Sequence, residues 1–81
     1  MEQASPVKIL IVDDEPRNRR LLEVFITAEG YVALHADSGQ DALALAVAEL
    51  PNLVLLDLMM PDMDGFQVMQ HLKEKIGRAH V

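Results

Sequence analysis

The chain contains no cysteine and no long hydrophobic run, and each absence excludes a class of protein. Without cysteine it can form neither a framework of disulfides nor a zinc site built from thiolates. Its longest apolar run covers residues 42–48 and is far shorter than the ~20 residues of a membrane-spanning helix. No basic segment precedes the first apolar run, so the start of the chain is a poor secretion signal. We therefore expect a cytoplasmic protein that does not enter a membrane.

Positive charge is also scarce, because 13 acidic residues outnumber 7 basic ones and give a net charge of −6. Neutralising the phosphates of a nucleic acid requires a basic face, so we expect no nucleic acid partner for this chain. The three histidines are scattered, without the spacing of metal ligands. No G-x-G-x-x-G motif follows the first predicted strand, which disfavours a dinucleotide-binding domain. With 81 residues, of which 51% are hydrophobic, the chain has the composition of one small globular domain.

Two short apolar runs, residues 7–12 and 53–56, end abruptly in acidic residues. Runs of this length between turn residues are typical of parallel strands that are buried on both faces. Asp13 and Asp14 follow the first run, and Asp57 follows the second. Because open α/β sheets bind ligands at the carboxyl ends of their strands, these acids lie where a functional site is expected. A lone Asp57 could instead simply end its strand and cap a turn.

Segments with helical spacing lie between and after these strands. Pro16 suits the first turn of a helix that ends at Gly30, and Ser38 can cap the next helix. Residues 31–36 alternate between outward and inward positions, as in a half-exposed edge strand. Residues 17–20 are expected to form a solvated helix face.

Each predicted helix has an apolar stripe that we expect to be buried. The stripe of the first helix is Leu21, Leu22, Phe25 and Ala28. The stripe of the second is Ala42, Leu43, Ala46, Val47 and Leu50, and that of a third, later helix is Val68, Met69 and Leu72.

The resulting order βαβαβα predicts an α/β fold with three parallel strands and helices on both faces of the sheet. Right-handed crossovers leave few topologies, and in all of them Asp13, Asp14 and Asp57 share one cleft. Three carboxylates this close repel one another unless a cation binds between them. The ion that fits best is Mg²⁺, which accepts carboxylate and water oxygens and leaves positions open for phosphate. A carboxylate beside Mg²⁺ can attack phosphorus and form an aspartyl phosphate.

Three motifs carry a resemblance to a known family: VKILIVDDEP at residues 7–16, LVLLD at 53–57 and MPDMDG at 60–65. Over residues 7–75 the chain resembles the receiver domain of two-component response regulators. The resemblance implies a flavodoxin-like fold whose complete strand order is 2-1-3-4-5, and this chain would have its first three strands in the order 2-1-3. It also implies phosphorelay signalling in the cytoplasm. The phosphoryl group comes from a sensor histidine kinase or a histidine phosphotransfer protein, and the domain is a conformational switch in its full-length parent rather than an enzyme.

The resemblance also implies a role for individual residues. Asp57 matches the phospho-acceptor, Asp14 a direct Mg²⁺ ligand, and Asp13 a ligand that usually acts through water. The backbone carbonyl of Met59 matches the remaining protein ligand of the metal. Pro61 and Gly65 match the family residues that shape the loop beside the phospho-acceptor.

The chain departs from the family pattern in its length. A complete receiver has five strand–helix units, and we expect three here, with the fourth and fifth units missing. Those units normally bring a Ser or Thr and a Lys that contact the phosphoryl group. An inactive receiver fragment, or a pseudo-receiver that only binds partners, is therefore the alternative. A Mg²⁺-dependent phosphatase is less favoured, because such enzymes usually have a second acid where this chain has Met59. The output domain is unknown.

The last six residues, IGRAHV at 76–81, are the translation of ATC GGA AGA GCA CAC GTC. That string is a widely used sequencing adapter, and its next triplet is the stop codon TGA. We therefore expect residues 1–75 to be the amino-terminal portion of a receiver domain and residues 76–81 to be a non-native tail.

Overall fold

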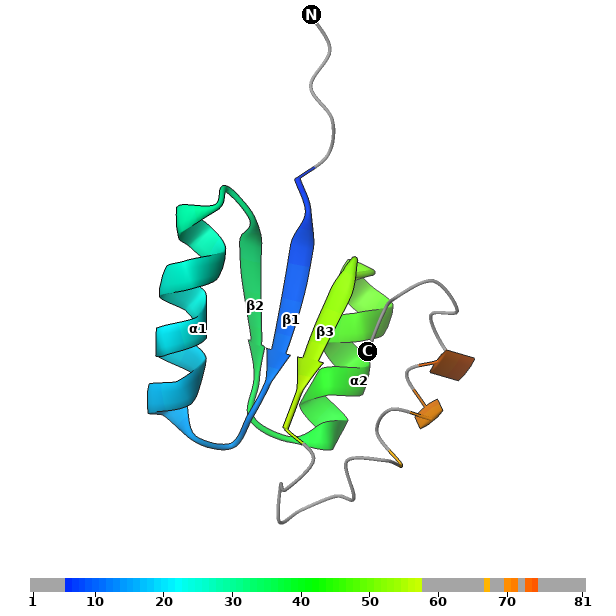
Figure 1. Cartoon of the computed structure of the whole chain (residues 1–81). Helices are drawn as coiled ribbons and strands as arrows, with labels where there is room; N and C mark the ends of the chain where they lie inside the picture. Colours follow the sequence, from blue (N-terminus) through cyan, green and yellow to red (C-terminus); the bar gives the residue numbers. More distant parts are fainter. Residues whose placement is uncertain (1–5, 58–66, 68–69, 72, 75–81) are drawn as a thin grey trace, which may run out of the picture.

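The structure is a computed structural model that describes residues 6–57, 67, 70, 71, 73 and 74. Its elements in chain order are β1 (Lys8–Val12), α1 (Pro16–Ala28), β2 (Val32–Ala36), α2 (Gly39–Glu49) and β3 (Leu53–Leu56) (Figure 1). The described residues from 67 onward are helical, where the third helix is expected. The positions predicted for its buried stripe, Val68, Met69 and Leu72, lie outside the described residues. None of the described helices combines the length and the hydrophobicity needed to cross a bilayer.

The three strands form one parallel sheet in the order β2-β1-β3, which confirms the predicted order. The central strand, β1, pairs with both neighbours, so that Val12 lies opposite Ala36 on one side and Leu56 on the other. Helix α1 covers one face of the sheet and α2 the other, as predicted (Figure 1). All three strands therefore end at the same edge.

The core is built on β1, whose side chains are buried on both faces. Ile9 and Ile11 contact Ile26 of α1 on one face, because successive strand residues point in opposite directions. On the opposite face the buried cluster is Leu10, Val12, Ala36, Ala42, Ala46 and Val54. Burying one large apolar side chain stabilises a fold by about 1.5–3 kcal/mol. The four buried residues of β1 are therefore a main source of the fold's stability.

The buried stripe predicted for α1 is only partly correct, because Leu22 packs against the core as predicted, whereas Ala28 is exposed. Leu22 and Ile26 face the core, whereas the side chains of Leu21 and Phe25 are 58% and 64% exposed. Both pairs are four residues apart, so each makes an apolar stripe along the helix. Periodicity alone could not choose between them, and the contact with β1 selects Leu22 and Ile26.

The stripe predicted for α2 is only partly correct. Ala42 and Ala46 are fully buried and Leu43 packs against the core cluster to which they belong, but Val47 and Leu50 are 56% and 64% exposed. The methyl side chains of the two alanines occupy little space, so α2 can lie close to the sheet. The larger apolar residues at the end of the helix are left at the surface.

Polar side chains cap the beginning of both helices, and Pro16 and Ser38 lie where the sequence predicts. Pro16 is the first residue of α1, and the Glu15 carboxylate before it accepts a hydrogen bond from the Arg17 amide at 3.3 Å. The Ser38 hydroxyl accepts one from the Asp41 amide at 3.2 Å. Both side chains satisfy amides that have no partner within their own helix.

Helix α1 ends at Ala28, and two residues later Gly30 has a φ of +86°, the left-handed conformation that favours glycine. The amide of Gly30 donates to the Thr27 carbonyl at 3.0 Å, and the amide of Tyr31 donates to the Ile26 carbonyl at 3.2 Å. This pair of bonds is a Schellman motif. It satisfies two carbonyls at the end of the helix and turns the chain back toward β2.

The beginning of β3 is attached to β1 by hydrogen bonds between Lys8 and Asn52. The Lys8 amide donates to Oδ1 of Asn52 at 2.9 Å, and the Asn52 amide donates to the Lys8 carbonyl at 2.8 Å. The Lys8 ammonium also donates to Oε1 of Glu49 at 3.1 Å and to its carbonyl oxygen at 3.2 Å, at the end of α2. These contacts fix the register of β3 against β1.

Helix α2 ends at Glu49, and the capping residue that follows, Leu50, has a positive φ of 49° without being a glycine. Its amide still donates to the Ala46 carbonyl at 3.0 Å. Pro51 follows, and proline cannot continue a helix because it lacks an amide hydrogen. An ordinary residue in this left-handed conformation is strained by roughly 1 kcal/mol.

We predict that Leu50→Gly raises the free energy of unfolding by about 0.5–1 kcal/mol, because glycine adopts this conformation without strain. The Leu50 side chain is 64% exposed, so little burial is lost. Urea denaturation followed by circular dichroism measures the change. The matched control is Ala48→Gly at an exposed position inside α2, which should lower stability by about 0.5–1 kcal/mol. Equal losses in both variants would contradict the strain at Leu50.

Candidate metal centre

The backbone bonds of the sheet continue one residue beyond the strands and place two acids side by side. The Asp13 amide donates to the Ala36 carbonyl of β2 at 3.1 Å. The Asp57 amide donates to the Val12 carbonyl of β1 at 2.9 Å. Because Val12 lies opposite Leu56, the residues that follow them, Asp13 and Asp57, are neighbours.

The structure brings together the three predicted carboxylates. Asp13, Asp14 and Asp57 each offer one oxygen, and these oxygens all lie within 4.8 Å of one another. Asp13 is buried, with 8% of its surface exposed, whereas Asp57 is half-buried and Asp14 is exposed. The other predicted site residues, Met59, Pro61 and Gly65, lie outside the described residues.

Gathering three negative charges has an energetic cost for the fold. Two charges at 4.8 Å repel by about 0.9 kcal/mol in bulk water and by about 3.5 kcal/mol at the effective dielectric constant of a protein surface. The orientation of Asp13 is fixed in spite of this, because its Oδ1 accepts a hydrogen bond from the Glu15 amide at 2.9 Å. The three acids therefore form a negatively charged site, and a bound cation would reduce the repulsion among them.

A second contact between like charges lies just after β2. The Asp37 carboxyl shares a hydrogen bond with Asp41 and also repels its charge, and together these raise the pKa of Asp41. Asp37 and Asp41 do not belong to the cluster of three acids. Since Asp41 is exposed, water screens this repulsion effectively.

The donor set fits a small, hard cation such as Mg²⁺. This ion prefers oxygen ligands at about 2.1 Å, so two ligands on opposite sides of it lie roughly 4.2 Å apart. Oxygens within 4.8 Å of one another are close to that spacing, and bound water can replace a carboxylate as a direct ligand. A site of carboxylates alone, without sulfur or imidazole, is also typical of magnesium rather than zinc.

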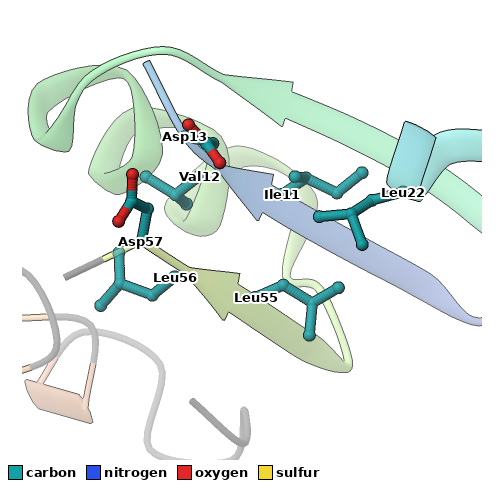
Figure 2. Close-up of a pocket in the computed structure, with 7 residues that line it drawn as sticks. All are labelled: Ile11, Val12, Asp13, Leu22, Leu55, Leu56 and Asp57. Atoms are coloured by element: carbon teal, nitrogen blue, oxygen red, sulfur yellow. The ribbon is translucent and has the colours of Figure 1, made fainter. Parts of the chain in front are cut away.

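A small cavity of about 140 Å³ adjoins the acids. Its lining residues are Ile11, Val12, Asp13, Leu22, Leu55, Leu56 and Asp57. Figure 2 shows the carboxylates of Asp13 and Asp57 at the strand ends, with the apolar side chains of Ile11, Leu22 and Leu55 farther along the sheet. The acids thus border an apolar wall, where charge interactions are stronger than in water.

Sequence reasoning missed one residue next to the acids. The segment 17–20 is predicted to be a solvated helix face, but Arg19 is half-buried and its Nη1 donates to the Asp13 carbonyl oxygen at 2.6 Å. A hint was present in the sequence, because positive side chains near the amino end of a helix are disfavoured by its dipole. This argument does not identify the hydrogen-bond acceptor of Arg19, because every residue has a backbone carbonyl.

Comparison with known proteins assigns the family. The family model of the response regulator receiver domain matches residues 9–81. The transcriptional regulatory protein ResD of Bacillus subtilis is 44% identical over 75 residues, which cover 93% of this chain and 31% of ResD. The response regulator PleD of Caulobacter vibrioides is 49% identical over 74 residues, which cover 91% of this chain and 16% of PleD. The chain spans less than a third of the length of these curated relatives.

Solved structures agree with this assignment. The response regulator TrrA of Thermotoga maritima, in complex with Mg²⁺ and BeF, matches with a TM-score of 0.84 and 37% identity over 90% of this chain and 64% of TrrA. TrrA in complex with the histidine kinase ThkA matches with a TM-score of 0.82 and 37% identity over 90% of this chain and 63% of that chain. The chemotaxis protein CheY4 of Vibrio cholerae matches with a TM-score of 0.83 and 28% identity over 86% of this chain and 58% of CheY4.

The chain thus spans about 60% of these receiver structures and shares their flavodoxin-like fold, which confirms both the resemblance and the predicted fold class. This chain belongs to the response regulator receiver domain family, whose members are regulatory phospho-acceptor domains of two-component signalling systems.

Proposed function

We propose that Asp57 accepts a phosphoryl group from a phosphohistidine, in a site where Asp13, Asp14 and Asp57 hold Mg²⁺. The observation that supports this most directly is the gathering of the three carboxylates within 4.8 Å at the carboxyl edge of the sheet. Phosphoryl transfer depends mainly on positioning and on charge stabilisation, and a carboxylate beside a cation held by two further acids would contribute both.

In the proposed transfer an oxygen of the Asp57 carboxylate attacks phosphorus, and a new O–P bond forms. The P–N bond to the donor imidazole breaks, and its electron pair stays on the nitrogen, which is then neutral or takes up a proton. The product is an aspartyl phosphate. When bound, Mg²⁺ supplies positive charge for the phosphoryl oxygens. Asp13 and Asp14 hold that charge in place, and the Met59 carbonyl is proposed as the remaining protein ligand.

The donor is a sensor histidine kinase or a histidine phosphotransfer protein. The solved complex of ThkA with TrrA supports this choice for a relative that is 37% identical, and the Mg²⁺–BeF complex of TrrA supports the choice of metal. The net charge of −6 argues against a nucleic acid partner for this chain. We propose a cytoplasmic location, in keeping with the absence of a membrane-spanning helix from the described residues.

The proposed output is a conformational switch in the full-length parent. ResD and PleD are much longer than this chain, so the effect of phosphorylation belongs to the parent protein.

We also propose that natural sequence continues from residue 75 and that residues 76–81 are not natural. Amplifying and sequencing the source DNA beyond the codon for Lys75 tests this, and a genomic sequence that encodes IGRAHV followed by a stop codon would disprove it.

Phosphoramidate, whose P–N bond resembles that of phosphohistidine, provides a direct test. With Mg²⁺ we expect up to one phosphoryl group per chain by intact-mass spectrometry, none for Asp57→Asn, and none when EDTA removes the metal. The control Asp41→Asn lies outside the carboxylate cluster and should be labelled like the parent chain. Equal labelling of Asp57→Asn would exclude Asp57 as the acceptor. No labelling of a chain that binds Mg²⁺ would favour a pseudo-receiver that only binds partners.

Asp13→Asn removes one of the three charges but keeps an oxygen that can accept from the Glu15 amide. Without metal, we expect its free energy of unfolding to rise by about 1 kcal/mol, because repulsion is relieved. Saturating Mg²⁺ should stabilise the parent chain, since a ligand of the native state alone favours that state. The same Mg²⁺ should stabilise Asp13→Asn much less.

Thermal unfolding with and without Mg²⁺ measures both effects. Glu29→Gln is the control, because it removes one negative charge from an exposed position outside the cluster. It should leave the response to Mg²⁺ unchanged. A metal-free Asp13→Asn that is less stable than the parent chain, yet gains as much from Mg²⁺, would contradict the site.

A further inference from the structure

We infer that Arg19 is a positioning residue of the acidic site, which holds the backbone of Asp13 so that the three carboxylates stay together before the metal binds. The inference rests on the proposed function, because it assigns Arg19 a role in the magnesium site. It concerns how the site is held, rather than which groups touch the ion.

Three polar groups of Asp13 have a partner in the structure. Its amide donates to the Ala36 carbonyl at 3.1 Å, and its Oδ1 accepts from the Glu15 amide at 2.9 Å. Its carbonyl oxygen accepts from Nη1 of Arg19 at 2.6 Å. The first two partners are backbone groups, so Arg19 supplies the one side chain among these three contacts. It links the fourth residue of α1 to the residue that follows β1.

Interactions within α1 do not explain why an arginine is present at position 19. Positive charge close to the amino end of a helix opposes the helix dipole, so the position is not one that favours arginine for local reasons. An arginine on a helix commonly pairs with an acid four residues before or after it, here Glu15 or Glu23. The Glu15 carboxylate accepts a hydrogen bond from the Arg17 amide. The Glu23 carboxylate instead lies 3.5 Å from Nε2 of His35 on β2. Arg19 is therefore directed toward Asp13 rather than along its own helix.

A cavity of about 350 Å³ lies on the side of α1 that faces the edge strand, lined by Pro16, Arg19, Arg20, Glu23 and His35. This space is large enough to hold water, so Arg19, which lines it, can be solvated from that side. The contact with Asp13 is thus not imposed by the need to bury or neutralise a charge.

Two roles for Arg19 predict opposite effects on the metal. If only its charge matters, removing a positive group beside a cation site must strengthen Mg²⁺ binding. If its hydrogen bond holds the site together, removing it must weaken Mg²⁺ binding. Loss of a group that orients a metal ligand typically weakens metal binding by about 10–100-fold. The direction of the change therefore separates positioning from simple electrostatics.

The experiment uses the 81-residue chain and four variants of it. Arg19→Met keeps the length and helix preference of the side chain but removes its charge and its donors. Arg19→Gln is a second neutral variant, whose shorter side chain cannot span to the carbonyl. Arg19→Lys keeps a charged donor. Arg17→Met is the matched control, because Arg17 is exposed on the same helix and its side chain forms no hydrogen bond with the described residues.

The first measurement is made without metal. The solvent exchange rate of the Glu15 amide, followed by NMR, reports whether its bond to Asp13 is formed. We expect exchange to be several-fold faster in Arg19→Met and Arg19→Gln, close to the parent rate in Arg19→Lys, and unchanged in Arg17→Met. Slow exchange of the β1 amides in the same spectra verifies that the sheet is intact.

The second measurement is a Mg²⁺ titration of the same samples. We expect about 10–100-fold weaker binding in Arg19→Met and Arg19→Gln, with most of the affinity restored in Arg19→Lys. Binding as tight as in the parent chain, or tighter, in both neutral variants would overturn the inference, as would unchanged exchange at Glu15. If Arg19→Met does not fold, the Mg²⁺ affinity and the Glu15 exchange rate of Arg19→Gln alone decide whether the inference is correct.

The two proposals fail in different ways. If the parent chain itself does not bind Mg²⁺, the proposed metal site is wrong, and the exchange rates still decide whether Arg19 positions Asp13. If the parent chain binds Mg²⁺ and the neutral variants bind it equally well, only the role of Arg19 is wrong.

Discussion

The arrangement of the molecule depends on the register in which β3 pairs with β1. At one end of the pair, Lys8 and Asn52 exchange two hydrogen bonds, and at the other the Asp57 amide bonds to the Val12 carbonyl. A slip of one residue would move β3 by about 3.3 Å and turn each of its side chains to the opposite face of the sheet. Asp57 would then leave Asp13, and apolar side chains would exchange faces. The geometry of the acids is thus determined by backbone pairing and not by contacts among the acids, which repel one another.

Because backbone pairing, and not attraction among the acids, positions the site, a strongly apolar strand can end in charged residues. Four residues of β1 are buried between α1 and α2, and their burial stabilises the fold enough to tolerate repulsion at the edge of the sheet. Asp13 and Asp57 lie one residue beyond the paired strands and Asp14 lies two residues beyond, where Asp14 is exposed and Asp57 is half-buried. A functional site of this kind reduces stability, and the core compensates for it.

The sequence predicts the position of the acids well, because few folds are compatible with its pattern of short apolar runs that end in acidic residues. A short apolar run that ends in acid must place the acid at the carboxyl edge of a parallel sheet, so Asp13 and Asp57 could be brought together from the pattern alone. The buried side of α1 could not be predicted, because Leu21 with Phe25 and Leu22 with Ile26 have the same spacing. Arg19 was missed since its acceptor is a backbone carbonyl, which any residue provides. The role of Met59 stays a prediction, because it lies outside the described residues.

The bond from the Asp13 amide to the Ala36 carbonyl has one more consequence. That carbonyl and the amide of Asp37 belong to the same peptide group, and a hydrogen bond to one end of a peptide group polarises the other. Movement of Asp13 therefore alters the electronic environment of the Asp37 nitrogen, which lies just after a different strand, β2. The backbone resonance of Asp37 is a built-in spectroscopic reporter on the state of the acidic edge.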